Sequence, residues 1–437
     1  MGKSQKLWKR AKNIIPGGSG LLSMRAEIFL PEKWPAYFRK AKGVEVWDLD
    51  GRKYVDMAYL GGVGACILGY ADPDVNRAVS RVIENGSIAT LNAPEEVELA
   101  ELLLKLHPWA GMVRYARTGG EAMAVAVRIA RAFTGRDKIA FCGYHGWHDW
   151  YLAANLADNK NLDGHLLPGL EPKGVPRALK GTSLPFHYNR IEELERIAKK
   201  HKGELAAIVV EPLRHQEPRN NFLEDIRKIA SRVEAVLIFD EISIGWRLNV
   251  GGAHLVYGVN PDIAVFAKAI SNGYPMAAII GRKRVMNAAQ ESFISSTYWT
   301  ERIGPAAAIA TIKKLRAKNV PAHLDKLGAA IQAGWEELAA KHGLLLTILG
   351  PNPIPNLSFN YSNSQAVRTL FTQEMLKRGF LATSSVYLSW AHKPEHVKKY
   401  LEASDKVFTI ISEALKAKRV EKLLEGPVAH SGFTRLT

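Results

Sequence analysis

Short apolar runs alternate with amphipathic stretches between about residue 75 and residue 300. The stretches at 121–133 and 221–232 have the spacing of helices. The apolar runs show almost no alternation with polar residues, and they cover residues 138–141, 206–210, 235–239 and 263–267. Strands that are apolar on both faces and separated by helices are typical of a parallel sheet with helices on each side. The pattern therefore predicts an α/β fold with a mostly parallel sheet.

Both ends of the chain carry a different pattern. Residues 44–47 and 52–56 flank the turn-like sequence Asp-Leu-Asp-Gly, which predicts a small β ribbon. After about residue 305 the pattern predicts a strand at 355–359 and helices at 305–317, 322–342, 364–378 and 394–416.

The length of 437 residues suits a division into a large and a small domain. We expect a large α/β domain at 61–310, and a small α+β domain formed by an N-terminal segment at 1–60 and a C-terminal segment at 311–437. Hydrophobic residues make up 47% of the chain and charged residues 23%, which excludes a wholly disordered protein.

The two cysteines, Cys66 and Cys142, are too few for a disulfide framework or a four-cysteine zinc site. The sequence contains neither an apolar signal core nor a run of about 20 apolar residues that could span a membrane. We therefore expect a cytoplasmic protein that makes no membrane contact.

The net charge is +16, from 59 basic and 43 acidic residues, which favours anionic partners. Nucleic-acid binding is one alternative that this charge raises. The basic residues are dispersed, however, and the chain has no zinc finger and no RNP-like aromatic motif, so the charge fits anionic small molecules better.

Chemically active side chains follow the predicted strands at the point where each strand ends. Tyr144, Glu211, Asp240 and Lys268 come directly after, or within a few residues of, the four apolar runs. Ligands of open parallel sheets bind beyond the carboxyl ends of the strands, so we expect these residues to share a site. Burial there would disfavour the ammonium form of Lys268 and make its amine a nucleophile.

Two further motifs have weaker chemical meaning. Gly119 and Gly120 precede a predicted helix, where backbone amides and the helix dipole attract anions. His145 and His148 lie three residues apart, but neither a third ligand motif nor HExxH accompanies them, so we expect no metal.

Together these residues resemble a class III aminotransferase, a pyridoxal 5′-phosphate (PLP) enzyme of fold type I, near the glutamate-1-semialdehyde 2,1-aminomutase branch. The similarity covers almost the whole chain. The motifs that carry it are Ile-Pro-Gly-Gly at 15–18, Trp-Asp-Leu-Asp-Gly-Arg at 47–52, Thr-Gly-Arg-Asp-Lys at 134–138, Tyr-His-Gly-Trp-His-Asp at 144–149, Glu-Pro at 211–212, Phe-Asp-Glu-Ile at 239–242, Gly-Trp-Arg at 245–247 and Gly-Val-Asn-Pro-Asp at 258–262.

The resemblance implies a large PLP-binding domain and a role for each matching residue. Lys268 matches the lysine that forms a Schiff base with PLP and moves protons during catalysis, and Asp240 matches the aspartate that pairs with the pyridine nitrogen. The remaining cofactor-binding positions are Tyr144 and Ile242 on the two ring faces, Gly119 and Gly120 at the phosphate, and Glu211 near the ring hydroxyl.

Two more matches concern a second subunit and the substrate. Thr297, or failing that Thr300, resembles the threonine that reaches the phosphate of the neighbouring subunit, which implies a homodimer with a shared active site. Arg25 resembles the arginine that holds a substrate carboxylate, although a surface salt bridge explains an arginine there equally well.

Several departures lie on the expected substrate side. Gly120 stands where Ser or Thr is usual, Ser271-Asn272-Gly273 follows the lysine in place of a glycine run, and Thr300-Glu301-Arg302 replaces the usual Gly-Asn-Pro. The loop at 86–94 also departs from the aminomutase pattern. We therefore expect an aminotransferase that moves an amino group between an amine or amino acid and a carbonyl acceptor. Intramolecular amino transfer, as in the aminomutase, is the alternative.

Overall fold

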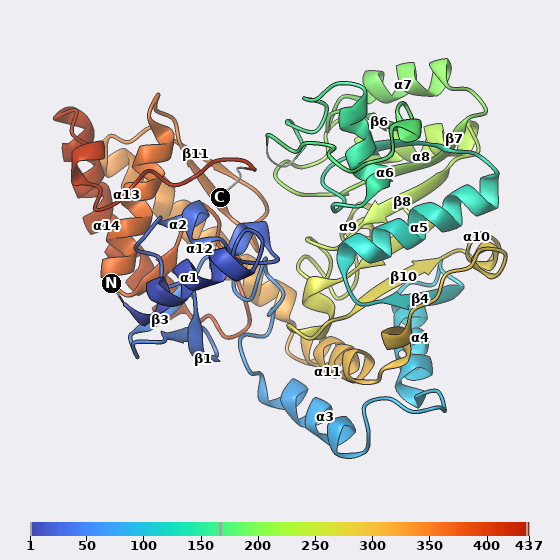
Figure 1. Cartoon of the computed structure of the whole chain (residues 1–437), viewed down its shortest axis with the longest axis horizontal. Helices are drawn as coiled ribbons and strands as arrows, with labels where there is room; N and C mark the ends of the chain where they lie inside the picture. Colours follow the sequence, from blue (N-terminus) through green and yellow to red (C-terminus); the bar gives the residue numbers. More distant parts are fainter. Residues whose placement is uncertain (1, 166–167, 434–435, 437) are drawn as a thin grey trace. The chain divides into compact units, whose positions relative to one another are not determined.

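The computed structural model describes residues 2–165, 168–433 and 436, and these divide into two units (Figure 1). The large unit comprises Pro73–Lys318, and the small unit combines Met1–Asp72 with Asn319–Thr437. No helix in the described part of the chain is both long and apolar enough to cross a membrane.

A seven-stranded sheet forms the centre of the large unit, in the order β4-β10-β9-β8-β7-β5-β6. Its strands are β4 (Met112–Ala116), β5 (Lys138–Cys142), β6 (Ser183–Pro185), β7 (Leu205–Val210), β8 (Val236–Asp240), β9 (Ile263–Phe266) and β10 (Ala277–Gly281). The pairs from β6 through β9 are all parallel, whereas β10 runs antiparallel to both β9 and β4. The prediction of a mostly parallel sheet is confirmed, and its four predicted strands are β5, β7, β8 and β9.

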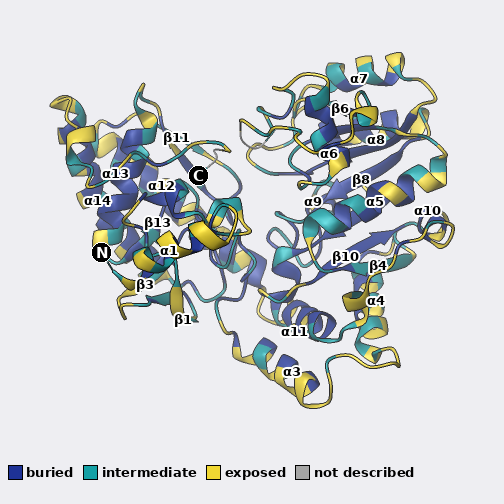
Figure 2. Cartoon of the chain, in the orientation of Figure 1, coloured by how far each residue is buried: buried dark blue, intermediate teal, exposed yellow. Residues whose placement is uncertain are grey.

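Helices cover both faces of this sheet. Helix α5 (Gly119–Thr134) packs on one face against alternate strand residues such as Val209 and Ile238. Helices α7 (Ile191–Lys200) and α8 (Phe222–Arg232) pack on the other face against the intervening residues, such as Ile208 and Leu237. Figure 2 shows these strands as a buried layer between helices with exposed outer faces. The sheet is therefore buried on both sides, as its apolar sequence requires.

Further helices complete the large unit. They are α3 (Pro73–Glu84), α4 (Pro94–Leu106), α6 (Asp149–Leu152), α9 (Ala253–Tyr257), α10 (Lys283–Met286) and α11 (Ile303–Ala317). Helix α11 packs against α3, α4 and the short 3₁₀ helix Lys268–Ser271. Helix α11 therefore supports the 3₁₀ helix that follows β9.

The small unit joins the two ends of the chain in one sheet. Strands β1 (Phe38–Lys42), β2 (Glu45–Asp48) and β3 (Lys53–Met57) form the predicted ribbon, and β13 (Phe380–Ala382) pairs parallel with β3. The other elements are the hairpin β11 (Leu346–Leu349) and β12 (Asn356–Phe359), and helices α1 (Lys3–Ile14), α2 (Ala26–Phe29), α12 (Val320–His342), α13 (Ser364–Lys377) and α14 (Pro394–Lys416).

One buried aspartate ties the start of β9 to its neighbours. The Asp262 carboxylate is 4% exposed and accepts hydrogen bonds from the Leu237 amide at 2.9 Å and from Arg227 Nη1 at 2.8 Å. It also forms an ion pair with Arg282, whose Nε lies 3.2 Å from Oδ1. Strands β8 and β9, helix α8 and the residue after β10 therefore meet at a single side chain.

We predict that Asp262→Ala lowers the free energy of unfolding by about 2–4 kcal/mol, because it leaves a partly buried arginine and a strand amide without their acceptor. Urea unfolding followed by circular dichroism measures this loss. Arg282→Met is the control: its side chain is 42% exposed, so that variant should lose less than about 1 kcal/mol. An Asp262→Ala protein that unfolds at the wild-type urea concentration would contradict the prediction.

Candidate active site

The carboxyl ends of three neighbouring parallel strands carry candidate side chains. Asp240 is the last residue of β8 and pairs in register with Val265 of β9. Glu211 directly follows β7, and Lys268 comes two residues after β9. Because β7, β8 and β9 are neighbours in the sheet, the fold brings these three residues to one edge.

Lys268 is half-buried and begins the 3₁₀ helix Lys268–Ser271 with a backbone φ of +49°. A positive φ is strained for a residue with a side chain, and such strain is common where a side chain must be aimed. The Lys268 amine donates a hydrogen bond to Ser243 Oγ at 2.8 Å. Burial lowers the pKa of Lys268 to about 8, although the negative charges of Asp240 and Glu211 oppose this shift.

Asp240 is 3% exposed, and its two oxygens have separate partners. Oδ1 accepts a hydrogen bond from the Ile242 amide at 3.0 Å, and Oδ2 lies 2.9 Å from His145 Nδ1. The other ring nitrogen of His145 lies 3.1 Å from the Cys142 carbonyl oxygen. The contact with His145 therefore fixes the orientation of the Asp240 carboxylate.

Glu211 fixes the loop that carries Tyr144. Its Oε2 accepts hydrogen bonds from the Tyr144 amide at 3.0 Å and from Arg214 Nη1 at 3.1 Å. Gly143 lies against this carboxylate with φ +117°, and a Cβ atom at Gly143 would lie 2.6 Å from Glu211 Oε2. The positive φ favours glycine at this position, and the bond to Glu211 holds the Tyr144 amide in place.

The start of α5 packs closely against the loops that follow β5 and β8. The capping box of Thr118 and Glu121 opens the helix, and its first two residues are Gly119 and Gly120. A Cβ atom at Gly119 would lie 2.9 Å from the Ile242 side chain, and one at Gly146 would lie 2.9 Å from Gly120 Cα. The loops after β4, β5 and β8 therefore touch one another. Amides at such a helix end attract an anion.

The other predicted site residues, Thr297, Thr300 and Arg25, belong to segments that do not directly follow a strand of this sheet edge. Thr297 and Thr300 are exposed at the two ends of the 3₁₀ helix Thr297–Thr300 in the large unit. Arg25 belongs to the small unit and lies between the 3₁₀ helix Leu22–Met24 and α2. A Cβ atom at Gly17 would overlap the Arg25 guanidinium, so this arginine packs directly over the Gly17 backbone.

Sequence reasoning missed the second layer of this site. It considered His145 only as a metal ligand, and the structure places His145 against Asp240. It also passed over Ser243 and Arg214, which bind Lys268 and Glu211. Their proximity to the strand ends was a usable signal, since each follows a candidate residue by three at most. Among the described residues, no group of three or more His, Cys, Asp or Glu side chains is arranged to bind a metal.

Known proteins resemble this chain over nearly its full length. The family described as aminotransferase class-III matches residues 31–383. The 3-aminobutyryl-CoA aminotransferase of Cloacimonas acidaminovorans is 30% identical over 416 residues, which cover 92% of this chain and 96% of that protein. The glutamate-1-semialdehyde 2,1-aminomutase of Acetivibrio thermocellus is 34% identical over 422 residues, which cover 92% and 96%. Among solved structures, the PLP internal aldimine form of the Sphingopyxis sp. MTA144 FumI protein matches with a TM-score of 0.86 and 27% identity, covering 97% of this chain and 100% of that one.

We predict that the Lys268 amine reacts with an acylating reagent in proportion to its neutral fraction, with a midpoint near pH 8 in the cofactor-free protein. The sign follows from burial, which disfavours the ammonium and leaves a neutral nucleophile above the pKa. Labelling at a series of pH values, read by peptide mass spectrometry, gives the midpoint. Exposed lysines in the same digest are the reference, since an unperturbed lysine amine titrates at about pH 10.4. A Lys268 midpoint at that reference value would contradict the prediction.

Proposed function

The chain belongs to the class-III aminotransferase family, and from this premise we propose that Lys268 is the residue that binds its cofactor, PLP. The family makes the chain a PLP-dependent enzyme of fold type I, with both aminotransferases and aminomutases among its relatives. The observation that carries the site assignment is the position of the Lys268 amine, which donates to Ser243 Oγ at 2.8 Å, one strand away from the Asp240 carboxylate, which is 3% exposed.

The residues at the sheet edge fit three of the polar groups of PLP. The Lys268 amine suits the aldehyde, the buried Asp240 carboxylate suits the pyridine nitrogen, and the glycine start of α5 suits the phosphate. When bound, PLP accepts the electron pair left on a substrate carbon after a proton departs. No metal is needed for this chemistry.

We assign Asp240 the task of keeping the pyridine nitrogen protonated. The contacts of the Asp240 carboxylate with His145 Nδ1 at 2.9 Å and with the Ile242 amide at 3.0 Å restrict its rotation, so it would stay oriented toward the pyridine nitrogen. Its negative charge favours the positively charged form of a nearby nitrogen. His145 is therefore a positioning residue that acts through Asp240.

We assign Lys268 the proton transfers. Its Nζ would take the proton from the carbon that bears the substrate amine and deliver a proton at the aldehyde carbon. The pKa of about 8 favours this, because an amine poised near neutral pH both accepts and donates protons readily. Ser243 Oγ, 2.8 Å away, holds the amine when it is not engaged.

The other residues would hold and orient the cofactor. Tyr144 and Ile242 would cover its two ring faces, and Glu211 would lie near its ring hydroxyl while it anchors the Tyr144 amide at 3.0 Å. We propose a homodimer in which Thr297 of a second subunit reaches the phosphate, since Thr297 lies exposed on the large unit. A cytoplasmic location stays a prediction.

We propose that the reaction is amino transfer between two small molecules, an amine or amino acid donor and a carbonyl acceptor. The 30%-identical 3-aminobutyryl-CoA aminotransferase supports this choice, as do the residues that depart from the aminomutase pattern after Lys268 and after Thr297. Arg25 would bind a substrate carboxylate. Intramolecular transfer is the second candidate, because the aminomutase of Acetivibrio thermocellus is 34% identical over 422 residues, against 30% over 416 residues for the aminotransferase.

We predict that the purified enzyme consumes an amine donor only as fast as a carbonyl acceptor is supplied. A panel of donors and keto acids, read by chromatography of both products, measures the stoichiometry. The Lys268→Ala variant is the control and should lose about 10²–10⁴-fold in rate, because the proton-transfer group is gone.

The competing reaction has its own readout. Glutamate-1-semialdehyde given without any acceptor should remain unconverted. Its conversion to 5-aminolevulinate at a rate above that of every donor–acceptor pair would contradict intermolecular transfer and establish the second candidate.

A further inference from the structure

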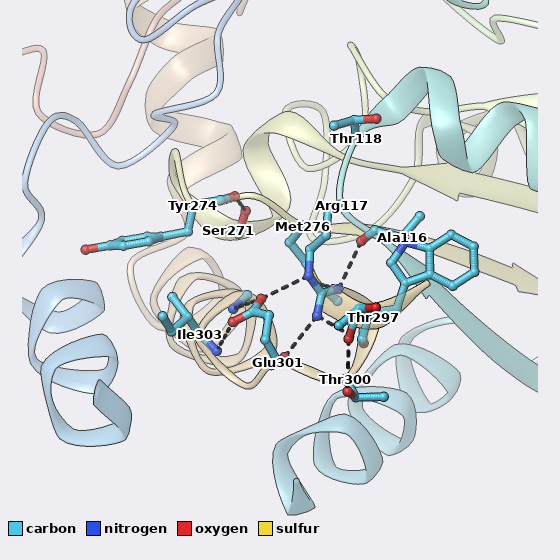
Figure 3. A network of polar contacts seen from close by, with 12 residues as sticks. Ala116, Arg117, Thr118, Ser271, Tyr274, Met276, Thr297, Thr300, Glu301 and Ile303 are labelled. Atoms are coloured by element: carbon cyan, nitrogen blue, oxygen red, sulfur yellow. Dashed lines mark hydrogen bonds and ion pairs between the residues drawn. The ribbon is translucent and has the colours of Figure 1, made fainter. Parts of the chain in front are cut away.

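A buried ion pair joins the loop before α5 to the segment that carries Thr297. Arg117 directly precedes the Thr118-Gly119-Gly120 loop. Its Nη2 donates hydrogen bonds to the carbonyl oxygens of Trp299 at 3.0 Å and Glu301 at 2.9 Å, and its Nε lies 2.9 Å from Glu301 Oε1 (Figure 3). The two side chains are only 11% and 15% exposed. One guanidinium thus binds the Trp299 carbonyl in the 3₁₀ helix and both the carbonyl and the carboxylate of Glu301, which directly follows that helix.

Glu301 also fixes the point where this segment becomes helix α11. Its carboxylate accepts hydrogen bonds from the Ile303 amide at 2.7 Å and the Gly304 amide at 3.0 Å. These are amides of the first turn of α11, which have no partner within the helix. The same carboxylate therefore pairs with Arg117 and caps α11, so the Thr297–Thr300 segment is fixed at its C-terminal end.

A second carboxylate strengthens the same connection. Glu121 Oε2 accepts hydrogen bonds from the Arg117 amide at 2.8 Å and the Thr118 amide at 3.3 Å. Glu121 Oε1 accepts a hydrogen bond from the indole nitrogen of Trp299 at 3.1 Å. The backbone of the loop and the side chain of Trp299 are thus bound to one residue in the first turn of α5.

The outward face of the segment is free of this network. Thr297, Tyr298 and Thr300 are exposed, and Tyr298 is 68% exposed. The inner residues, Trp299 and Glu301, make the contacts to Arg117 and Glu121. The network therefore sets the position from which Thr297 is presented.

The energetics favour a positioning role over a stabilising one. Burial lowers the pKa of Arg117, while the charges of Glu301 and Glu96 oppose the shift. Removing two charges from water costs free energy that a single ion pair often fails to recover, and apolar replacements of such pairs are frequently neutral or stabilising. A buried pair of this kind contributes most through the geometry that it enforces.

We infer that Arg117 and Glu301 are positioning residues that couple the two sides of a phosphate site. The pair ties the loop that would bind the phosphate of its own subunit to the segment from which Thr297 would reach the phosphate of a second subunit. This inference rests on the proposed function, because it takes Gly119, Gly120 and Thr297 as phosphate contacts.

The test measures PLP binding by the cofactor-free dimer, read by the visible absorbance of the bound cofactor. We expect Arg117→Met to raise the dissociation constant for PLP about 10- to 100-fold, the loss of roughly one charge-assisted hydrogen bond. Pyridoxal, which lacks the phosphate, should bind the variant and the wild type equally. Glu301→Gln is the second variant, for use if Arg117→Met does not fold. Its amide oxygen can still accept a hydrogen bond from the first turn of α11, and it should also raise the dissociation constant for PLP.

Arg136→Met is the matched control. Arg136 is another arginine of the large unit that bonds carbonyl oxygens, including that of Val233 at 2.7 Å, and pairs with a glutamate, Glu234, at 3.1 Å. It lies beside the amino ends of β7 and β8, away from the candidate site. Its replacement should leave the PLP constant unchanged.

A double-mutant cycle with Thr297→Val separates the possible failures. If Arg117 acts by placing Thr297, adding Arg117→Met to Thr297→Val should raise the PLP constant less than about threefold further. Full additivity, or an equal loss of pyridoxal binding, would overturn the inference and leave the proposed function standing. A wild-type protein that binds PLP no better than pyridoxal, or a Thr297→Val protein with wild-type PLP affinity, would overturn the phosphate site on which both rest.

Discussion

A buried carboxylate at the end of one strand and a lysine amine just past the end of the next are the pair on which the rest of the site depends. Asp240 is almost inaccessible to water, and its charge acts directly on Lys268. Burial favours the neutral form of Lys268 and lowers its pKa, while the charge of Asp240 opposes this shift. His145 and the Ile242 amide bind the Asp240 carboxylate, whereas the Lys268 amine donates to a neutral partner, Ser243 Oγ.

The parallel sheet explains why such a pair can be placed with accuracy. Strands β7, β8 and β9 are buried on both faces and held in register, so their carboxyl ends cannot move independently. The loops beyond them are then locked by residues of the same edge: Glu211 holds the Tyr144 amide, and Gly119 packs against Ile242. Rigid strand ends with glycine-rich loops satisfy both needs of a cofactor site, fixed charges and close approach of the backbone.

Much of this arrangement could be predicted from the sequence. The apolar runs at β5, β7, β8 and β9 predict the strands, and the candidate residues follow each run directly, as Asp240 and Lys268 do, or within three residues, as Tyr144 does. Strand β10, which runs antiparallel to β4 and β9, was not among the predicted strands, and an apolar run would not in any case reveal its direction. The partners of Arg117 were also beyond reach: the Glu301 carbonyl that it binds is 184 residues away, and no local pattern reports a contact of that range.

The central claim is that Lys268, among all lysines of the chain, bonds to PLP. Borohydride reduction of the enzyme loaded with PLP, followed by proteolysis and peptide mass spectrometry, tests it most directly. The account predicts that the phosphopyridoxyl group is found on the peptide that contains Lys268 and on no other peptide at comparable yield. A protein that takes up no PLP, or one that carries the group on a different lysine, would contradict the account.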